Sequence, residues 1–194
     1  MKRAIFFISL VMSVQYAYTV RAESASLEKW TAFLQRPTAH NLDDLISQIS
    51  VFVEKCDWGR SEYEDAVPSK IRYALFNKIA SGNEASLRVG FYTAQCFGGG
   101  ARVDFGRSAG QFFDKKPKEF LQEVKRSSVS MEMYVEIMVL FPESLIDDVS
   151  GQINAVVRRI RILEQNKIDH ELYNAGMYAL KKEERELKSI RNSQ

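Results

Sequence analysis

A glycine–serine–glycine motif is the sharpest chemical signal in this chain. Residues 106–110 read Gly-Arg-Ser-Ala-Gly, a literal G-x-S-x-G pattern centred on Ser108. In serine hydrolases of the α/β type, such glycines permit a strained turn that exposes the serine hydroxyl. Asp147, Asp148 and His170 follow in the chain order that this fold uses for its catalytic triad. A small serine hydrolase is therefore one hypothesis for the function.

The elements expected around this motif argue against catalysis. The motif needs a strand before it and a parallel sheet around it, whereas apolar residues here recur at helical spacing. Gly106 and Gly110 stand one helical turn apart, which close packing against a neighbouring helix explains. We expect Ser108 to be a small helical residue rather than a nucleophile, and we assign no catalytic residue.

No other motif in the chain is as specific. Gly98-Gly99-Gly100 could offer backbone N–H groups to an anion, but it lacks the lysine and the spacing of a phosphate-binding loop. We interpret it as a joint between helices. His40 and His170 are the only histidines, and neither belongs to an H-x-x-x-H or H-x-x-E pattern. Capping or surface roles are expected for both, with no metal site and no cofactor.

The best candidate for an interface is a polar loop that follows Cys56. Aromatic and acidic side chains alternate there on a predicted surface segment: Asp57, Trp58, Glu62, Tyr63, Glu64 and Asp65. Exposed aromatic residues anchor protein interfaces, and acidic residues favour a basic partner. The alternative is that Trp58 and Tyr63 fold inward as part of the core.

Residues 1–22 read as a secretory signal peptide. Lys2 and Arg3 precede an apolar stretch of 11 residues (4–14), and Val20 and Ala22 are the small residues of a cleavage site. That stretch is too short for an ordinary transmembrane helix, which needs about 20 residues. We therefore expect a periplasmic or secreted protein with no stable membrane span after cleavage.

Removal of this segment changes the charge balance. The whole chain has a formal net charge of +2, but residues 23–194 carry 24 basic and 25 acidic side chains. A near-neutral domain lacks the electrostatic signature of a nucleic-acid-binding protein, so no such partner is expected. Basic residues from Arg158 to Lys188 alternate with acids, which predicts a solvated helix face.

Two cysteines, Cys56 and Cys96, are present. An even number in an oxidising compartment predicts one disulfide. The bridge closes a loop of about 40 residues and contributes about 4 kcal/mol on the chain-entropy account. Two buried free thiols are the alternative.

Apolar spacing predicts helices nearly everywhere after the signal, and we find no convincing strand. Helices are expected over residues 27–34, 68–80, 84–97 and 102–114, and a further helix begins at Pro117. The predicted N-caps of the others are Asn41, Ser128 or Ser130, Ser144, and Asp169. The acidic pairs Asp43–Asp44 and Asp147–Asp148 are expected in first helical turns, where negative charge interacts favourably with the positive end of the helix dipole.

The predicted fold class is all-α, with eight or nine short helices packed as antiparallel hairpins. They form either a bundle or a degenerate HEAT-like array, because no strict repeat is visible. We expect a signal peptide (1–22) and one helical domain (23–194), whose charged end (181–194) projects or frays.

Residues 112–121 (FFDKKPKEFL) contain a short helix, a polar turn with proline and a Phe-Leu pair. In this respect the stretch resembles exported bacterial helical-repeat proteins, HEAT-like and of undefined function, over about residues 68–126. The resemblance implies a fold and a compartment, not an activity.

The leading hypothesis is an exported helical protein that binds another macromolecule, since helical arrays offer broad grooves and ridges. The expected partner is a protein in the cell envelope or outside the cell. Two versions are an immunity protein that neutralises an envelope-active toxin and an envelope scaffold. Binding of an apolar ligand between helices is a third possibility.

Overall fold

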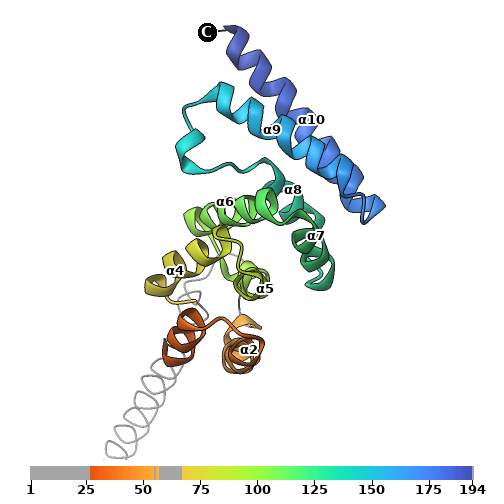
Figure 1. Ribbon diagram of the computed structural model, residues 1–194. Helices are drawn as coiled ribbons and strands as arrows, with labels where there is room; N and C mark the ends of the chain where they lie inside the picture. Colours follow the sequence, from red (N-terminus) through yellow and green to blue (C-terminus); the bar gives the residue numbers. More distant parts are fainter. Residues whose placement is uncertain (1–26, 55, 57–66, 194) are drawn as a thin grey trace, which may run out of the picture.

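The computed structural model describes residues 27–54, 56 and 67–193, and the regular elements in them are helices (Figure 1). A first helix covers residues 27–35. The elements that follow are α2 (Ala39–Val53), α4 (Ser69–Ala80), α5 (Glu84–Thr93), η1 (Ala94–Cys96), α6 (Gly99–Lys115), α7 (Pro117–Arg126), α8 (Met131–Val139), η2 (Glu143–Leu145), α9 (Val149–Gln165) and α10 (His170–Ser193). The all-α class is confirmed, and no strand occurs within these described ranges.

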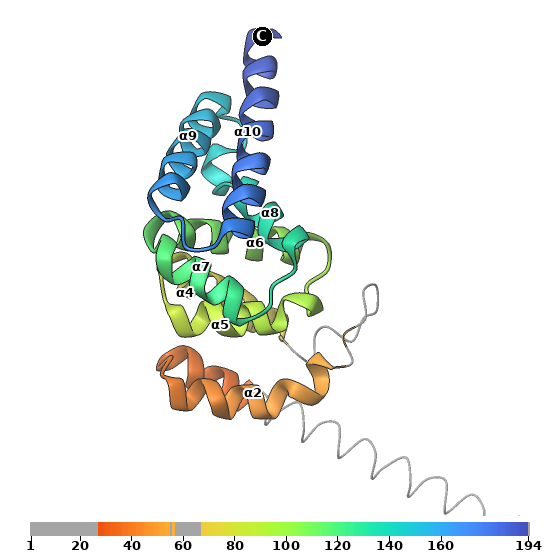
Figure 2. The ribbon, with the colours of Figure 1, turned by 90° about the vertical axis from the view of Figure 1, so that its right-hand side faces the viewer.

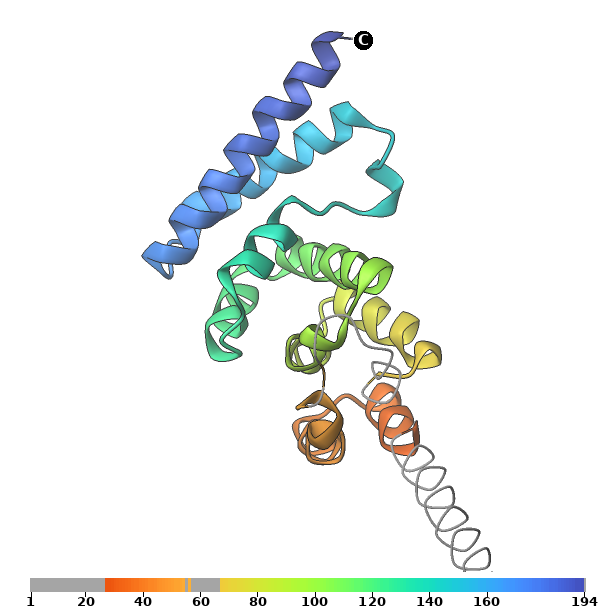
Figure 3. The ribbon, with the colours of Figure 1, turned by 180° about the vertical axis from the view of Figure 1, so that it is seen from behind.

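The helices stack in layers that follow the chain order. Figure 2 shows the first helix and α2 at one end, α4 to α7 in the middle, and α9 with α10 at the other end. Figure 3, which views the molecule from behind relative to Figure 1, also shows α9 packed beside α10. Buried apolar side chains form one continuous core through these layers, from Trp30 to Leu187.

Several predicted helix starts are confirmed. Pro117 occupies the first turn of α7, where its missing N–H costs nothing. Ser130 caps α8, because its hydroxyl accepts a hydrogen bond from the Met133 N–H at 3.2 Å. Asp169 caps α10 by accepting from the backbone N–H groups of Glu171 and Leu172.

The predicted start of α2 at Asn41 is wrong. Thr38 is the N-cap, and its hydroxyl accepts from the Asn41 N–H at 3.3 Å. The Asn41 side chain instead donates to the Arg36 carbonyl at 2.7 Å. Because α2 begins earlier than expected, no acid lies in its first turn, and Asp43 and Asp44 fall beyond it.

The predicted cap of the long helix at Ser144 is also wrong. Ser144 lies within the short helix η2, and α9 begins only at Val149. Its N-cap is Asp148, which accepts from the Gly151 N–H at 2.8 Å. The acidic pair Asp147–Asp148 therefore precedes the helix instead of filling its first turn.

The glycines of the middle layer do two different things. Gly99 and Gly100 form the first turn of α6 and are not a separate joint; Gly99 has a φ of +48°, which glycine adopts readily. Gly90 in α5 permits close packing of the neighbouring helices. A Cβ there would lie 2.7 Å from the ring of Phe105 and 2.8 Å from Ile79.

Apolar spacing places Leu27 on the same helix face as Trp30 and predicts that Ala74 faces inward, but both residues are exposed. On α4, Phe76 is buried instead, and its ring contacts those of Phe97 and Phe105. The inward face of α4 is therefore set by its packing against α6.

The charged C-terminal stretch continues α10 to Ser193, and Figure 2 shows it projecting past the other helices. The structure describes residues 181–193 as regular helix. Leu187 is buried in this part of the helix, and Lys188 pairs with Glu184 one turn earlier at 2.6 Å. Such i,i+4 pairs stabilise exposed helices.

Candidate functional site

Ser108 lies in the middle of α6 and not on a strained turn. Its side chain is only 8% exposed, and its hydroxyl donates to the Asp104 carbonyl, one turn earlier, at 2.9 Å. This is the local bond that a serine within a helix commonly makes. Ser108 is therefore an ordinary helical residue whose hydroxyl proton is already donated to a backbone carbonyl.

The two glycines of the motif allow α8 and α9 to approach α6. A Cβ on Gly106 would lie 2.5 Å from the Leu140 side chain. A Cβ on Gly110 would lie 2.7 Å from Arg159 Nη2 and 2.9 Å from the Leu140 carbonyl oxygen. The expectation that close helix packing explains both glycines is therefore confirmed.

Arg159 is a fully buried cation that the sequence analysis placed on a solvated face. Its Nε and Nη2 donate to the two carboxylate oxygens of Asp114, at 2.9 and 3.1 Å. Its Nη1 donates to three carbonyl oxygens at the end of α8, those of Ile137, Met138 and Leu140, at 3.3, 2.8 and 2.9 Å.

These bonds give Arg159 a structural role. They satisfy carbonyl groups that a helix end leaves without partners, and they join α6, α8 and α9. The guanidinium also lies 4.9 Å from the centre of the Phe141 ring. A sequence signal existed, since Arg159 shares a helix face with the buried Val156 and Leu163.

A second buried charge, Glu123, joins α5 to α7. Its side chain is nearly buried and accepts from both Nε and Nη2 of Arg88, at 3.1 and 3.2 Å. Arg126 and the Ser127 hydroxyl supply two further donors, at 3.1 and 2.9 Å. The carboxylate is well satisfied, as buried charges require, and its role is structural.

Asp148 and His170 of the hypothetical triad make local contacts that do not involve Ser108, and Asp147 is exposed. Asp148 caps α9, and Asp169, which precedes His170, caps α10. His170 is exposed, and its ring lies 3.2 Å from the Asn174 amide nitrogen.

Asp169 is held in its charged form. The Leu172 N–H, the Lys125 ammonium at 3.1 Å and the Glu171 N–H lower the pKa of its carboxyl. These contacts suit a helix cap, because they stabilise the carboxylate where the helix dipole also favours negative charge. No group of three or more possible metal ligands occurs in the part of the chain that the structure describes.

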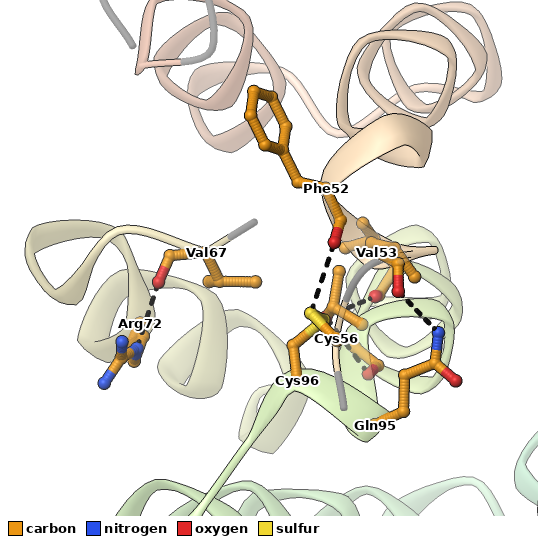
Figure 4. The surroundings of a disulfide bond; sticks show 10 residues. Phe52, Val53, Cys56, Val67, Arg72, Gln95 and Cys96 are labelled. Atoms are coloured by element: carbon orange, nitrogen blue, oxygen red, sulfur yellow. Dashed lines mark hydrogen bonds between the residues drawn. A yellow bond between two sulfur atoms is a disulfide. The ribbon is translucent and has the colours of Figure 1, made fainter. Parts of the chain in front are cut away.

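Cys56 and Cys96 form the expected disulfide, with their Cα atoms 5.1 Å apart (Figure 4). The bridge joins the chain just after α2 to the end of η1. Beside it, the Gln95 side-chain amide donates to the Val53 carbonyl at 3.0 Å. The bridge and this hydrogen bond together fasten the N-terminal layer to the middle layer.

The predicted interface loop begins directly after this bridge. Its residues lie outside the described part of the chain: Asp57, Trp58, Glu62, Tyr63, Glu64 and Asp65. The loop therefore stays a prediction.

The structure shows a second candidate surface, a groove of about 510 Å³ between α4 and α6. Tyr73 on α4 is 78% exposed at this groove. The charged and amide side chains that line it come from α4, α6 and η2: Arg72, Asn77, Asp104, Arg107, Gln111 and Glu143.

We call this surface the α4–α6 groove. It is not predicted from the sequence, because its lining depends on which helices become neighbours. A partial signal was present, since Tyr73 and Asn77 lie one turn apart on the polar side of a predicted helix.

Comparison of the chain with protein-family models, with curated proteins and with solved structures finds no match. No family is shown. Among the described helices, none is long and apolar enough to cross a membrane.

Proposed function

We propose that this chain is an exported helical protein that acts by binding another macromolecule, a protein of the cell envelope or of the outside medium. The α4–α6 groove is the observation that carries the proposal. Tyr73 presents an exposed ring there, and the side chains of Asn77, Gln111 and Glu143 make no hydrogen bond or ion pair within the described ranges. Aromatic residues ringed by polar groups are typical anchors of protein interfaces.

Export is proposed from the N-terminal segment and is supported by the disulfide. Disulfides persist in oxidising compartments and are rare in the cytosol. The periplasm and the outside medium are the two proposed destinations. N-terminal sequencing of protein from an exporting host tests this step, and we expect chains that begin at Glu23.

Site-specific photocrosslinking in cells tests the binding proposal. A photoreactive amino acid replaces Tyr73 in one variant and Tyr178 in the control, because Tyr178 is also strongly exposed (70%) but lies on α10. We expect a discrete adduct with one protein only from position 73. Absence of an adduct at position 73, or equal adducts at both positions, contradicts the proposal that the groove is the interface.

The predicted loop supplies a second position for the same experiment. A photoreactive residue at position 58 should give the same adduct if the loop and the groove contact one partner. A different adduct, or none, separates the predicted loop interface from the groove.

Two biological roles fit this proposal: an immunity or inhibitor protein, and an envelope scaffold. The resemblance to exported HEAT-like proteins is compatible with either role. A toxin encoded by the neighbouring gene supports the immunity role, and the chain should then protect cells that express that toxin. A scaffold should instead form adducts with resident envelope proteins in the absence of any toxin.

A further inference from the structure

The polar lining of the α4–α6 groove restricts what it binds. Docked helices usually lay an apolar face into an apolar groove. Among the described lining residues, Tyr73 is the one large ring that is strongly exposed, whereas Phe76 is only 7% exposed. Apart from this ring, most of the side chains that an amphipathic helix would cover there are charged or polar.

The charges of the groove argue against a nucleic acid or another polyanion. Arg107 pairs with Asp104 on the same helix at 3.5 Å. Arg72 also lines the groove, and its Nε donates to the Val67 carbonyl at 3.0 Å. With Glu143, the described residues that line the groove include two cations and two anions, so they offer no excess of positive charge to phosphates.

Three side chains that line the groove, those of Asn77, Gln111 and Glu143, make no hydrogen bond or ion pair in the described part of the chain. They are of two chemical kinds. Asn77 and Gln111 face the groove from opposite walls, and each amide both donates and accepts hydrogen bonds. A peptide backbone presents the same two functions at each residue. Glu143 only accepts when ionised, and its charge complements a basic side chain.

The length of the groove suits a short stretch of chain. The lining residues of α4, from Ser69 to Asn77, span about 12 Å at the helical rise of about 1.5 Å per residue. An extended peptide covers that distance with about four residues.

We propose that the α4–α6 groove binds an extended polypeptide segment of the partner, with a basic side chain against Glu143 and an apolar side chain against Tyr73. The amides of Asn77 and Gln111 hydrogen-bond to the backbone of that segment. This inference rests on the proposed binding function and names the kind of segment that the groove takes.

The test uses the protein purified from a host that exports it and a random library of linear peptides. We expect enrichment of peptides in which lysine or arginine stands near an aromatic or aliphatic residue. A synthetic peptide of the enriched sequence should bind at least about tenfold more weakly to Y73A and to E143Q, a change of about 1.4 kcal/mol. The Y178A variant, changed at an exposed tyrosine outside the groove, should bind like the wild type.

Three outcomes overturn the inference. The first is that no peptide is enriched, and the second is that the enriched peptides lack basic residues. The third is that the synthetic peptide binds Y73A and E143Q as tightly as it binds the wild type. Circular dichroism of each variant checks that the helices are retained. Binding of neutral oligosaccharides such as chito- or cello-oligosaccharides, with no peptide enriched, assigns the groove to a glycan instead.

The proposed function can survive failure of this inference. If no linear peptide binds while crosslinking at position 73 still captures one protein, the partner presents a folded surface to the groove. If both experiments fail, the groove is not an interface.

Discussion

The Arg159 guanidinium packs directly against Gly110, between α6 and α9. A Cβ at Gly110 would lie only 2.7 Å from Arg159 Nη2, so no larger residue fits there without a shift. The same Nη2 donates to Asp114, so its position is fixed by a charged hydrogen bond. The second glycine of the G-x-S-x-G pattern thus makes room for a buried ion pair. This relationship explains the glycine without any catalytic role.

The substitution Gly110→Ala should therefore be strongly destabilising. The new methyl group must displace the guanidinium or the α8 backbone, and a buried charge that loses its partners costs about 3–5 kcal/mol. We expect a loss of about 3 kcal/mol or more in the free energy of unfolding, measured with urea. Substitution of Arg159 by methionine should leave Asp114 without its main partner and give a loss of similar size.

Gly100→Ala is the matched control in the same helix. A Cβ at Gly100 meets no atom within 4 Å, and its φ is not positive. We expect the stability to be unchanged or raised by up to about 1 kcal/mol, the difference in helix propensity between alanine and glycine. Equal losses of unfolding free energy in G110A and G100A would contradict the explanation that Gly110 is needed to make room for Arg159.

The sequence predicted most helices correctly, because apolar spacing and caps such as Ser130 and Asp169 act locally. It gave the wrong N-cap where two nearby residues can both cap a helix, as at Thr38 and Asn41. Which of them caps the helix depends on the path of the backbone into its first turn. It missed the burial of Arg159, because only the fold brings Asp114 and the end of α8 to that side chain. The α4–α6 groove was missed for the same reason, as its walls come from separate helices.

Loss of the disulfide should weaken the attachment of the N-terminal layer. The sulfur atoms join residues 40 positions apart in the sequence. On the chain-entropy account, a double variant with serine at positions 56 and 96 loses about 4 kcal/mol. Urea unfolding of the oxidised wild type against this variant measures the loss. Non-reducing mass spectrometry of exported protein checks the bridge itself, and two free thiols there would contradict it.

Ser108 should not react with a fluorophosphonate probe. Its hydroxyl lies within a helix, is largely buried and donates to the Asp104 carbonyl at 2.9 Å, so its proton is engaged by the helix backbone. We expect no labelling of the purified protein, and the Ser108→Ala variant should fold with the same helical circular dichroism spectrum. Labelling that disappears in this variant would restore the serine hydrolase hypothesis.

Tyr134 should make the stability depend on pH in the alkaline range. Burial, and secondarily the charge of Asp169, raise the pKa of this phenol above its ordinary value. Its hydroxyl donates to the Leu172 carbonyl at 3.0 Å, which joins α8 to α10. In the unfolded chain the phenol loses its proton near pH 10, whereas in the folded chain it keeps it.

The unfolded state therefore binds fewer protons than the folded state above about pH 10, and the stability contributed by the neutral phenol is lost as the pH rises further. Below that pH the contribution is fully present. The Tyr134→Phe variant should lose about 1 kcal/mol near neutral pH, from the missing hydrogen bond, and should show a smaller decline above pH 10. Urea unfolding between pH 7 and pH 11 measures both effects. Tyr178→Phe, changed at an exposed tyrosine of α10, serves as the control, and an alkaline decline that is the same in Y134F and in the wild type would contradict the assignment.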